Sequence, residues 1–420
     1  MSRGAAVIER IRRLEGGGLR TFVDEDPLVW DRAEGAWIWD ADGERYLDLY
    51  AGFAVAAIGY GHPAVVEAIA EQARRLIHCP SAHPSESRAA FLEELARIAP
   101  PGLDRILPAV TGAMANELAV AVARTRRPNG AVVTFEGSYF GRSPGIVGYA
   151  GKPRYREALG VPQAGLFVPF PYPFRDGDAA TNLTMEALER QITTAGTLAA
   201  VLLEPIQGNG GVVIPPEDFL PRLRAFCDRA GALMIVDEIQ SGCGRTGRMW
   251  AVERSGVVPD LMTVGKGIGG GMGVAAVLGR GDLLNWQPDV YTSTFLTNAV
   301  TLAAATAAIR VLREGSLLER GASLGKSTLE RMRELLDGVR GVGEVRGVGL
   351  WIGIELVDDA GRADPDRAKR AARLARARGV LVGRGGYEEQ VVKLSPPLVI
   401  DEDDLAAGIE TVATCVREAG

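Results

Sequence analysis

Cysteine and histidine are both scarce in this sequence, which has 4 cysteines and 3 histidines among 420 residues. The cysteines are scattered and form no C-x-x-C pair, so the sequence favours neither a disulfide framework nor a zinc site. A Ser-His-Asp triad or a histidine-based metal site would have to use His62, His78 or His83. We therefore expect no bound metal.

An excess of basic residues and a long apolar run are also missing. The net charge is −6, from 47 basic and 53 acidic residues, and no basic stripe with interleaved aromatics occurs, which argues against a nucleic-acid partner. No apolar run reaches membrane-spanning length, so no membrane partner is expected. The first residues, MSRGAAVIERIRRLEGGG, lack the apolar core of a secretory signal, and we expect a cytoplasmic protein.

Short apolar runs alternate with helix-like segments through the middle of the chain. This alternation predicts an α/β domain with a largely parallel sheet, in which ligands bind beyond the carboxyl ends of the strands. Polar residues follow four of the predicted strands: Glu136, Glu204, Asp237 and Lys266. The predicted strands are 131–134, 199–203, 233–236, 261–264 and 274–278, and the predicted helices among them are 115–124, 185–194 and 218–230.

The two ends of the chain differ from this middle part. Short strands and turns, including a hairpin over 36–49, are expected before residue 61. Helix-like runs over 317–336, 366–378 and 402–418, together with short strands, predict a smaller α+β region after residue 312. Because 420 residues exceed one ordinary domain, we predict an N-terminal segment over 1–60 that packs with the small domain, a large ligand-binding domain over 61–312 and a C-terminal small domain over 313–420.

Three glycine-rich patterns resemble nucleotide-binding loops. Residues 242–247 and 265–270 both fit G-x-G-x-x-G, but no predicted amphipathic helix follows either one to hold a pyrophosphate on its N-terminus. Residues 325–328 fit the end of a P-loop, although Arg320 stands where that motif needs its first glycine and both flanks are helical. We therefore predict loops at the first two patterns and a surface helix at the third.

Lys266 follows a predicted strand directly and is surrounded by glycines, in TVGKGIGGGMG. Most lysines are solvated surface residues, but this one stands where the ligand site is expected. Burial can lower the pKa of a lysine and make its neutral amine available for Schiff-base chemistry. Asp237 follows the preceding strand, 29 residues earlier. Pyridoxal phosphate (PLP) needs both groups, a lysine to form an imine with its C4′ and a carboxylate to keep its pyridine nitrogen protonated, so the pair predicts PLP as the cofactor.

Nine segments, two of which contain Asp237 and Lys266, carry motifs in a fixed order along nearly the whole chain. They are GYGHP (59–63), TGAMANE (111–117), FEGSYFGRS (135–143), LLEPIQGNGG (202–211), VDEIQSGCGRTG (236–247), TVGKGIGGG (263–271), TSTFLTN (292–298), VRGVGLWIGIEL (345–356) and VVKLSPPL (391–398). This ordered set resembles the class III aminotransferases, PLP-dependent enzymes of fold type I. The resemblance implies a large PLP-binding domain with a mostly parallel seven-stranded sheet, and a smaller α+β domain formed by the C-terminal part and the N-terminal segment.

The resemblance also implies roles for residues around the cofactor ring. Lys266 is then the Schiff-base lysine and the base and acid of the proton shift, and Asp237 pairs with the pyridinium nitrogen. Gln240 contacts the ring hydroxyl, and Ile239 packs beneath the ring. Tyr139 stacks on the other face of the ring, unless it is simply a core residue.

Three further cofactor contacts follow from the same resemblance. The amides of Gly112 and Ala113 precede a helix-like run and hold the phosphate at a helix N-terminus. Thr294 reaches the same phosphate from a neighbouring subunit, which implies a homodimer or a dimer of dimers. Glu204 lies near the ring and orients the side chains around it, or has a purely structural role.

The sequence departs from the family pattern at several of these positions. The phosphate loop of most relatives reads S/T-G-S/T-E-A, whereas residues 111–115 read TGAMA, so one side-chain hydrogen bond worth about 0.5–1.5 kcal/mol is lost. Many relatives also carry a glutamate that masks an arginine, which grips the α-carboxylate of glutamate or 2-oxoglutarate. Asn209 and Lys393 stand at these two positions here, and lysine lacks the bidentate fork of arginine. Arg142 stands where some relatives hold a distal carboxylate, and Phe53 is a further expected substrate contact.

These residues predict a PLP-dependent aminotransferase that moves an amino group from a primary amine to a keto or aldehyde acceptor by a ping-pong mechanism through Lys266. An ω-amino acid, a diamine, a diaminobutyrate-like compound or an amino sugar all fit as donor. The alternative is an amino acid racemase or epimerase of the same family, in which Lys266 returns the proton to the carbon from which it was removed. A catalytically silent or nucleotide-binding protein is a third possibility, against which both Lys266 and Asp237 argue.

Overall fold

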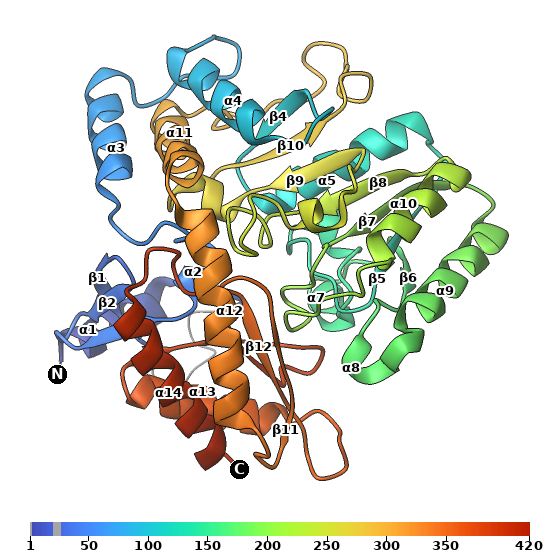
Figure 1. The fold of residues 1–420 in the computed structure, drawn as a ribbon. Helices are drawn as coiled ribbons and strands as arrows, with labels where there is room; N and C mark the ends of the chain where they lie inside the picture. Colours follow the sequence, from blue (N-terminus) through green and yellow to red (C-terminus); the bar gives the residue numbers. More distant parts are fainter. Residues whose placement is uncertain (1, 20–26) are drawn as a thin grey trace.

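The computed structural model describes residues 2–19 and 27–420, and a sheet of seven strands forms the centre of its larger part (Figure 1). The strands are β4 (Arg105–Ala109), β5 (Ala131–Phe135), β6 (Leu166–Val168), β7 (Leu198–Leu203), β8 (Leu233–Asp237), β9 (Leu261–Val264) and β10 (Ala275–Gly279). Their order is β4-β10-β9-β8-β7-β5-β6. Only β10 runs antiparallel to its neighbours, β4 and β9. The predicted mostly parallel seven-stranded sheet is therefore confirmed.

Helices cover both faces of this sheet, so its central strands are buried on both sides. All six residues of β7, LAAVLL, are buried, as expected for an apolar run in the middle of a parallel sheet. On one face α5 packs against β7, β9 and β10, and on the other α10 packs against β7 and β8. Long helices also surround the sheet; they are α3 (Pro63–Arg75), α4 (Glu86–Ile98), α5 (Gly112–Arg126), α9 (Ala180–Ala195), α10 (Phe219–Ala230) and α11 (Ala299–Glu314).

Short helical turns lie between the longer elements. They are α2 (Ala51–Ala54), α6 (Pro144–Val147), α7 (Pro153–Glu157), α8 (Pro173–Asp176), η2 (Gly177–Ala179), η3 (Ala251–Ser255) and η4 (Lys266–Gly269). Neither predicted loop, 242–247 nor 265–270, opens an α-helix; the second leads through η4 toward β10. The predicted absence of a following amphipathic helix is therefore confirmed at both patterns.

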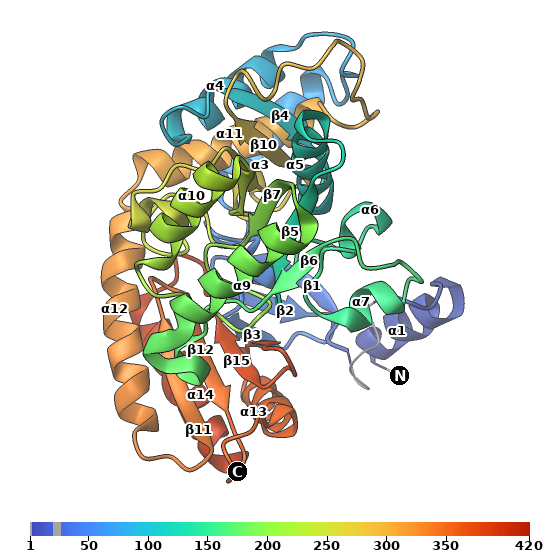
Figure 2. The same ribbon diagram turned by 90° about the vertical axis from the view of Figure 1, so that its right-hand side faces the viewer.

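The C-terminal part forms a smaller α+β layer, and the N-terminal hairpin joins it. Its elements are α12 (Leu317–Leu336), β11 (Val342–Gly347), β12 (Ile352–Leu356), α13 (Pro365–Ala377), β13 (Val380–Leu381), β14 (Gly383–Gly385), β15 (Val391–Leu394) and α14 (Glu402–Glu418). One sheet has the order β11-β12-β15-β14, and a second joins β1 (Trp30–Glu34), β2 (Trp37–Asp40) and β3 (Arg45–Asp48) to β13. Figure 2 shows α11 and α12 following one another along one edge of the molecule. The two domain boundaries given above, at 60/61 and 312/313, stay a prediction.

The N-terminal segment contains one helix that was not predicted from the sequence. The expectation of turns and short strands is wrong for α1 (Arg3–Leu14), a helix of three turns. Ser2 caps it, with its Oγ accepting from the backbone N–H of Ala5 at 3.1 Å. The amphipathic pattern of this stretch is therefore a helix signal as well as evidence against a secretory signal.

Candidate active site

Three parallel strands that lie side by side bring three ionisable groups to one edge of the sheet. Asp237 is the last residue of β8, Glu204 follows β7, and Lys266 follows β9 after a single glycine. Lys266 has a left-handed φ of 46°, which a non-glycine residue rarely adopts outside functional sites. As expected from the alternation of strands and helices, the fold thus places the carboxylates of Asp237 and Glu204 beside Lys266.

Asp237 is a buried carboxylate held by neutral donors. Its Oδ2 accepts from the amide of Asn116 at 2.7 Å, and its Oδ1 accepts from the backbone N–H of Ile239 at 2.8 Å. Thr263 in β9 fixes the orientation of this amide by donating its hydroxyl to Asn116 Oδ1 at 2.8 Å. Burial raises the pKa of Asp237 to about 6, against the effect of these hydrogen bonds and of Lys266. No cation forms an ion pair with Asp237 in the described parts of the chain, so the site offers a fixed negative charge to a cationic ligand atom.

Glu204 connects two backbone segments of the site. Its Oε1 accepts from the N–H of Tyr139 and its Oε2 from the N–H of Gly208, both at 2.9 Å. Burial and then the charge of Asp237 raise the pKa of Glu204 to about 7. Glu204 therefore fixes the positions of Tyr139 and of the 207–211 loop.

The amine of Lys266 is available for reaction. Burial lowers its pKa to about 8; Asp237 and Glu204 oppose this shift, and the charge of Lys393 adds to it. Among residues 2–19 and 27–420, no carboxylate forms an ion pair with this amine. A lysine with a lowered pKa and no fixed partner is suited to nucleophilic attack on a carbonyl.

The N-terminus of α5 lies beside these groups. Thr111 caps the helix, its Oγ1 accepting from the N–H of Met114 at 3.2 Å, so the amides of Gly112 and Ala113 are left for a ligand. A Cβ added at Gly112 would stand 2.7 Å from Cδ1 of Ile239, which shows how closely Ile239 packs against this turn. The helix N-terminus predicted to hold the phosphate and Ile239, the residue predicted beneath the ring, are therefore neighbours.

Asn209 and Lys393 hydrogen-bond different partners. Lys393 in β15 is 1% exposed, and its Nζ donates to the carbonyl oxygen of Gly208 at 3.1 Å. The Oδ1 of Asn209 accepts instead from the hydroxyl of Tyr155 at 3.3 Å. A Cβ at Gly208 would stand 2.3 Å from Oε1 of Gln240, so Gln240 also lies against this loop. The structure thus places these three predicted site residues around one loop, with the cation of Lys393 directed at its backbone.

Phe53 belongs to a short left-handed turn, α2, whose four residues have φ between 47° and 67°. Such a backbone costs a non-glycine residue about 1–2 kcal/mol. Buried Asp48 holds the turn. It accepts from the backbone N–H of Tyr50 just before the turn, from that of Gly52 within it, and from the hydroxyl of Tyr60 at 2.7 Å. Phe53 is 52% exposed, and its ring contacts Tyr50 at 5.2 Å. Because Tyr50 lies 5.4 Å from the amine of Lys393, this strained turn presents Phe53 near the site.

Arg142 and Thr294 lie at the margin of this arrangement. The guanidinium of Arg142 lies 5.9 Å from the ring of Tyr139 and 4.1 Å from the ring of Tyr155. Thr294 is exposed between β10 and α11. Within the described chain no hydrogen bond joins Thr294 to the other predicted residues, so it is the one predicted cofactor contact that the fold of a single chain does not bring to the centre.

Comparison with known proteins identifies the family. The model of the family described as aminotransferase class-III matches residues 21–416. The chain is a class III aminotransferase. Like the rest of that family it depends on PLP, and the cofactor prediction is confirmed.

Individual relatives share the fold and differ in their named activities. The aminotransferase is 39% identical to an acetylornithine aminotransferase of Methanopyrus kandleri, over 94% of this chain and 95% of that protein. It is 31% identical to an alanine/serine racemase of Pyrococcus horikoshii, over 99% of this chain and 91% of that protein. The crystal structure of an (S)-enantioselective ω-transaminase from Thermomicrobium roseum superposes with a TM-score of 0.92 and 29% identity, covering 100% of this chain and 99% of that one. Similarity alone therefore does not select the substrate.

The residues of the aminotransferase fit PLP by their own chemistry. The buried carboxylate of Asp237 is suited to a protonated ring nitrogen, the amine of Lys266 to an aldehyde, and the amides at the start of α5 to a phosphate. Gly112 has no side chain to obstruct the turn between that helix and Ile239. All three requirements of the cofactor are met at one edge of the sheet.

Some residues of the site were not predicted from the sequence. Asn116 lies within the quoted TGAMANE motif, and a fully buried asparagine in the middle of an apolar helix face is the signal that could have identified it. Tyr155 and Lys152 contact the loop at Asn209 but carry no local pattern. The carboxylate next to Asp237, Glu238, points elsewhere: it accepts from Ser241 and from the backbone of Val252.

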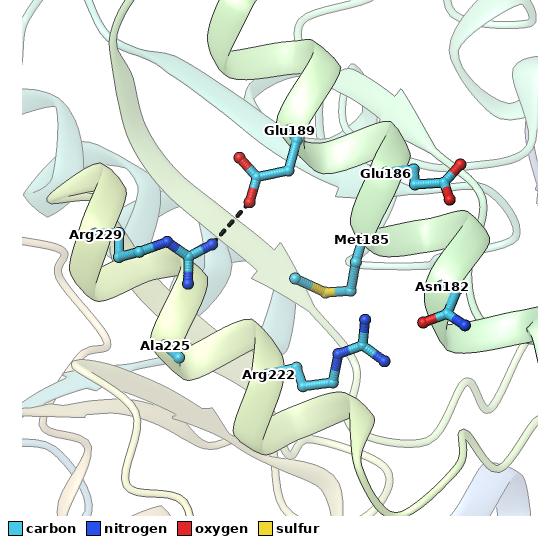
Figure 3. A pocket seen from close by; sticks show the side chains of 7 residues that line it. All are labelled: Asn182, Met185, Glu186, Glu189, Arg222, Ala225 and Arg229. Carbon is cyan, nitrogen blue, oxygen red and sulfur yellow. Dashed lines mark hydrogen bonds and ion pairs between the residues drawn. The ribbon is translucent and has the colours of Figure 1, made fainter.

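A pocket of the aminotransferase lies away from the residues of the candidate active site. Figure 3 shows it between α9 and α10, with a volume of about 360 Å³. Its lining residues are Asn182, Met185, Glu186, Glu189, Arg222, Ala225 and Arg229. Arg229 pairs with Glu189 at 2.7 Å and Arg222 with Asp218 at 2.9 Å, so both cations already have carboxylate partners. In the described parts of the chain no helix is long and apolar enough to span a bilayer, and no cluster of three or more His, Cys, Asp or Glu residues is placed to hold a metal.

Proposed function

We propose that this aminotransferase takes the amino group from an ω-amino acid, a primary amine whose carboxylate lies several bonds away, and transfers it to a keto or aldehyde acceptor. The observation that carries the proposal is Arg142, a cation at the margin of the site with no ion-pair partner among the described residues. The two nearby cations, Lys152 and Arg154, are both paired with Glu389. Arg142 is therefore the charge left for a substrate carboxylate.

The cofactor roles of the individual residues are part of this proposal. PLP, when bound, supplies the carbonyl that receives the amino group and a ring that withdraws electrons. Asp237 holds the proton on the ring nitrogen, Ile239 and Tyr139 enclose the ring, and Gln240 contacts its hydroxyl. Glu204 acts on the ring indirectly, because it fixes the backbone of Tyr139.

Proton transfer in the proposed site is the task of Lys266. Its amine, once released by the substrate, removes the proton from the substrate carbon that carries nitrogen and delivers it to C4′. The pKa of about 8 that burial gives this amine lies close to neutral pH, which suits a group that must accept and then donate a proton. In a racemase the same amine would return the proton to the substrate carbon, and no acceptor would be consumed.

The first test measures consumption of 4-aminobutyrate with and without an acceptor. We expect turnover only when an acceptor is present, together with a lower kcat/KM for butylamine, which has the same chain length and no carboxylate. Conversion of one enantiomer of an amino acid into the other, with no acceptor present, would support the racemase alternative and contradict the proposal. Equal kcat/KM values for 4-aminobutyrate and butylamine would contradict only the assignment of an ω-amino acid as the donor.

A second assay, the half-reaction of the aminated enzyme with each acceptor, should show a limited benefit from an α-carboxylate on the acceptor. 2-Oxoglutarate and succinic semialdehyde differ only in that carboxylate. A hydrogen bond to a charged group contributes about 1.5–3 kcal/mol, so an arginine fork would favour 2-oxoglutarate by at least about tenfold in kcat/KM. Because Lys393 is buried and already donates to Gly208, we expect an advantage below about tenfold. A larger advantage would show that Lys393 binds the α-carboxylate well.

We further propose that two copies of the chain make the active unit, with Thr294 reaching the phosphate of the partner site. The neighbouring Phe295 and Ile77 are 63% and 62% exposed, which is unusual for large apolar side chains. Phe295 also contacts His78 at 5.5 Å, so the exposed residues are adjacent. We expect sedimentation to give a dimer or tetramer, and Phe295→Asp to give monomers that bind PLP more weakly. A wild-type protein that is active as a monomer would contradict this.

A further inference from the structure

Tyr155 lies at the centre of the substrate side of the site, although no sequence motif marks it. It belongs to α7 and is 7% exposed. Its ring meets Tyr139 edge-on at 5.7 Å, and the guanidinium of Arg142 stacks over it at 4.1 Å. Its hydroxyl donates to Oδ1 of Asn209 at 3.3 Å. Three residues with expected roles at the cofactor or the substrate therefore contact this one tyrosine.

The position of Tyr155 is itself fixed by a cluster of charges. Arg154 donates to the hydroxyl at 3.3 Å, and the amine of Lys152 lies 6.0 Å from the ring. Both cations are tied to Glu389. Burial raises the pKa of the Tyr155 hydroxyl, but Lys152 and Arg154 outweigh it and hold this pKa below its usual range. The ring is therefore a rigid support whose environment is rich in positive charge.

Arg142 needs such a support because its long side chain is exposed and has no carboxylate partner in the described parts of the chain. An exposed arginine loses considerable side-chain entropy when it must hold a ligand in one place. Stacking on an aromatic face fixes the plane of the guanidinium before the ligand arrives and leaves its N–H edge free for a carboxylate.

We propose that Tyr155 is a positioning residue that sets donor specificity: it holds the guanidinium of Arg142 at a fixed distance from the amine-binding end of the site, and so selects donors that carry a distal carboxylate. The inference rests on the proposed function, since it names how that carboxylate is recognised. Tyr155 itself touches neither the cofactor nor the reacting atoms in this scheme. Its effect should therefore appear in donor binding and not in the absorption of bound PLP.

The test compares 4-aminobutyrate with butylamine in the holoenzyme and in Tyr155→Leu, Tyr155→Phe and Arg142→Gln. Tyr155→Leu removes the stacking, and kcat/KM for 4-aminobutyrate should fall about tenfold, mainly through KM. Butylamine should change by less than about threefold. Tyr155→Phe keeps the ring and loses only the hydroxyl contacts, so its loss with 4-aminobutyrate should be smaller. The visible absorption of bound PLP should stay as in the wild type in both variants.

The double variant Tyr155→Leu with Arg142→Gln decides whether the effect passes through Arg142. We expect its kcat/KM for 4-aminobutyrate to be no lower than that of Arg142→Gln alone, because Tyr155 acts only through the guanidinium that Arg142→Gln removes. Tyr149→Phe is a matched control: Tyr149 is also buried beneath an arginine, Arg124 at 5.8 Å. Among residues 2–19 and 27–420, however, the hydroxyl of Tyr149 has no hydrogen-bond partner and makes no hydrogen bond with Asn209. This control should behave as the wild type with both donors.

Four results would overturn the inference. Equal losses with both donors in Tyr155→Leu, or losses that add fully to those of Arg142→Gln, would make Tyr155 a structural residue only. If the wild type does not prefer 4-aminobutyrate and Arg142→Gln changes neither donor, the ω-amino acid proposal fails, and this inference fails with it. A preference that disappears in Arg142→Gln and survives in Tyr155→Leu would overturn the role of Tyr155 alone.

Discussion

Replacing Lys266 with alanine is expected to lower kcat by about 10⁴-fold, near the upper end of what general acid–base catalysis contributes, because the variant also loses its covalent link to PLP. Single-turnover measurement with saturating 4-aminobutyrate would show this loss. Lys326→Ala is the matched control, since Lys326 is exposed on α12 and should not affect turnover. Small primary amines in solution should restore part of the activity of Lys266→Ala, which a misfolded variant would not show. A rate within tenfold of the wild type would contradict the role given to Lys266.

The lowered pKa of the same lysine predicts how the apoenzyme captures PLP. Only the neutral amine attacks an aldehyde, so capture should accelerate as pH rises and level off above about 8, the pKa of Lys266. The charge of Lys393 contributes to this lowering, so Lys393→Met should move the midpoint to higher pH. Visible absorption after mixing apoenzyme with PLP measures the rate. A midpoint near 10.5, the ordinary value for lysine, would show that burial does not act on this amine.

The sequence predicted the centre of the site well because that centre depends on local order along the chain. Asp237 and Lys266 each follow an apolar run, and parallel neighbouring strands place such residues at one edge of the sheet. The helices α12 and α14 were predicted with the bounds that the structure has, since each shows a sustained helical period. The strand β6 was not predicted, because three residues are too few to show any period.

Contacts between distant segments could not be predicted in the same way. Asn116 meets Asp237 across 121 positions of the chain, and Tyr155 meets Asn209 across 54. Nothing in the residues next to Tyr155 indicates that Arg142 stacks on it, because that contact depends on how two connecting segments fold over the strand ends. The same holds for Asp48, whose carboxylate fixes a left-handed turn. Sequence patterns therefore predicted which residues lie at the strand ends but not which residues support them.

Asp237→Asn and Glu238→Gln are expected to differ in their effect on kcat, although the two carboxylates are adjacent and both buried. Asp237→Asn keeps the size of the side chain and removes the charge that holds the ring proton of PLP. Loss of one partner of a buried ion pair costs about 3–5 kcal/mol, so kcat should fall by roughly 10²–10⁴-fold. The melting temperature of the apoenzyme should also fall, because an amide can accept from only one of the two donors, the amide of Asn116 and the backbone N–H of Ile239.

Glu238→Gln should affect stability alone. Oε1 of Glu238 accepts from the N–H of Val252 at 2.7 Å and Oε2 from the hydroxyl of Ser241 at 2.5 Å. An amide can replace one of these acceptors only, and the unsatisfied group costs about 1–3 kcal/mol. We expect a lower melting temperature with kcat within about threefold of the wild type at temperatures where the variant is folded. Thermal unfolding and steady-state kinetics on both variants separate the two roles. If both variants lost activity to the same extent, the chemistry would depend on buried charge near the strand end in general and not on the alignment of Asp237 with one ring atom.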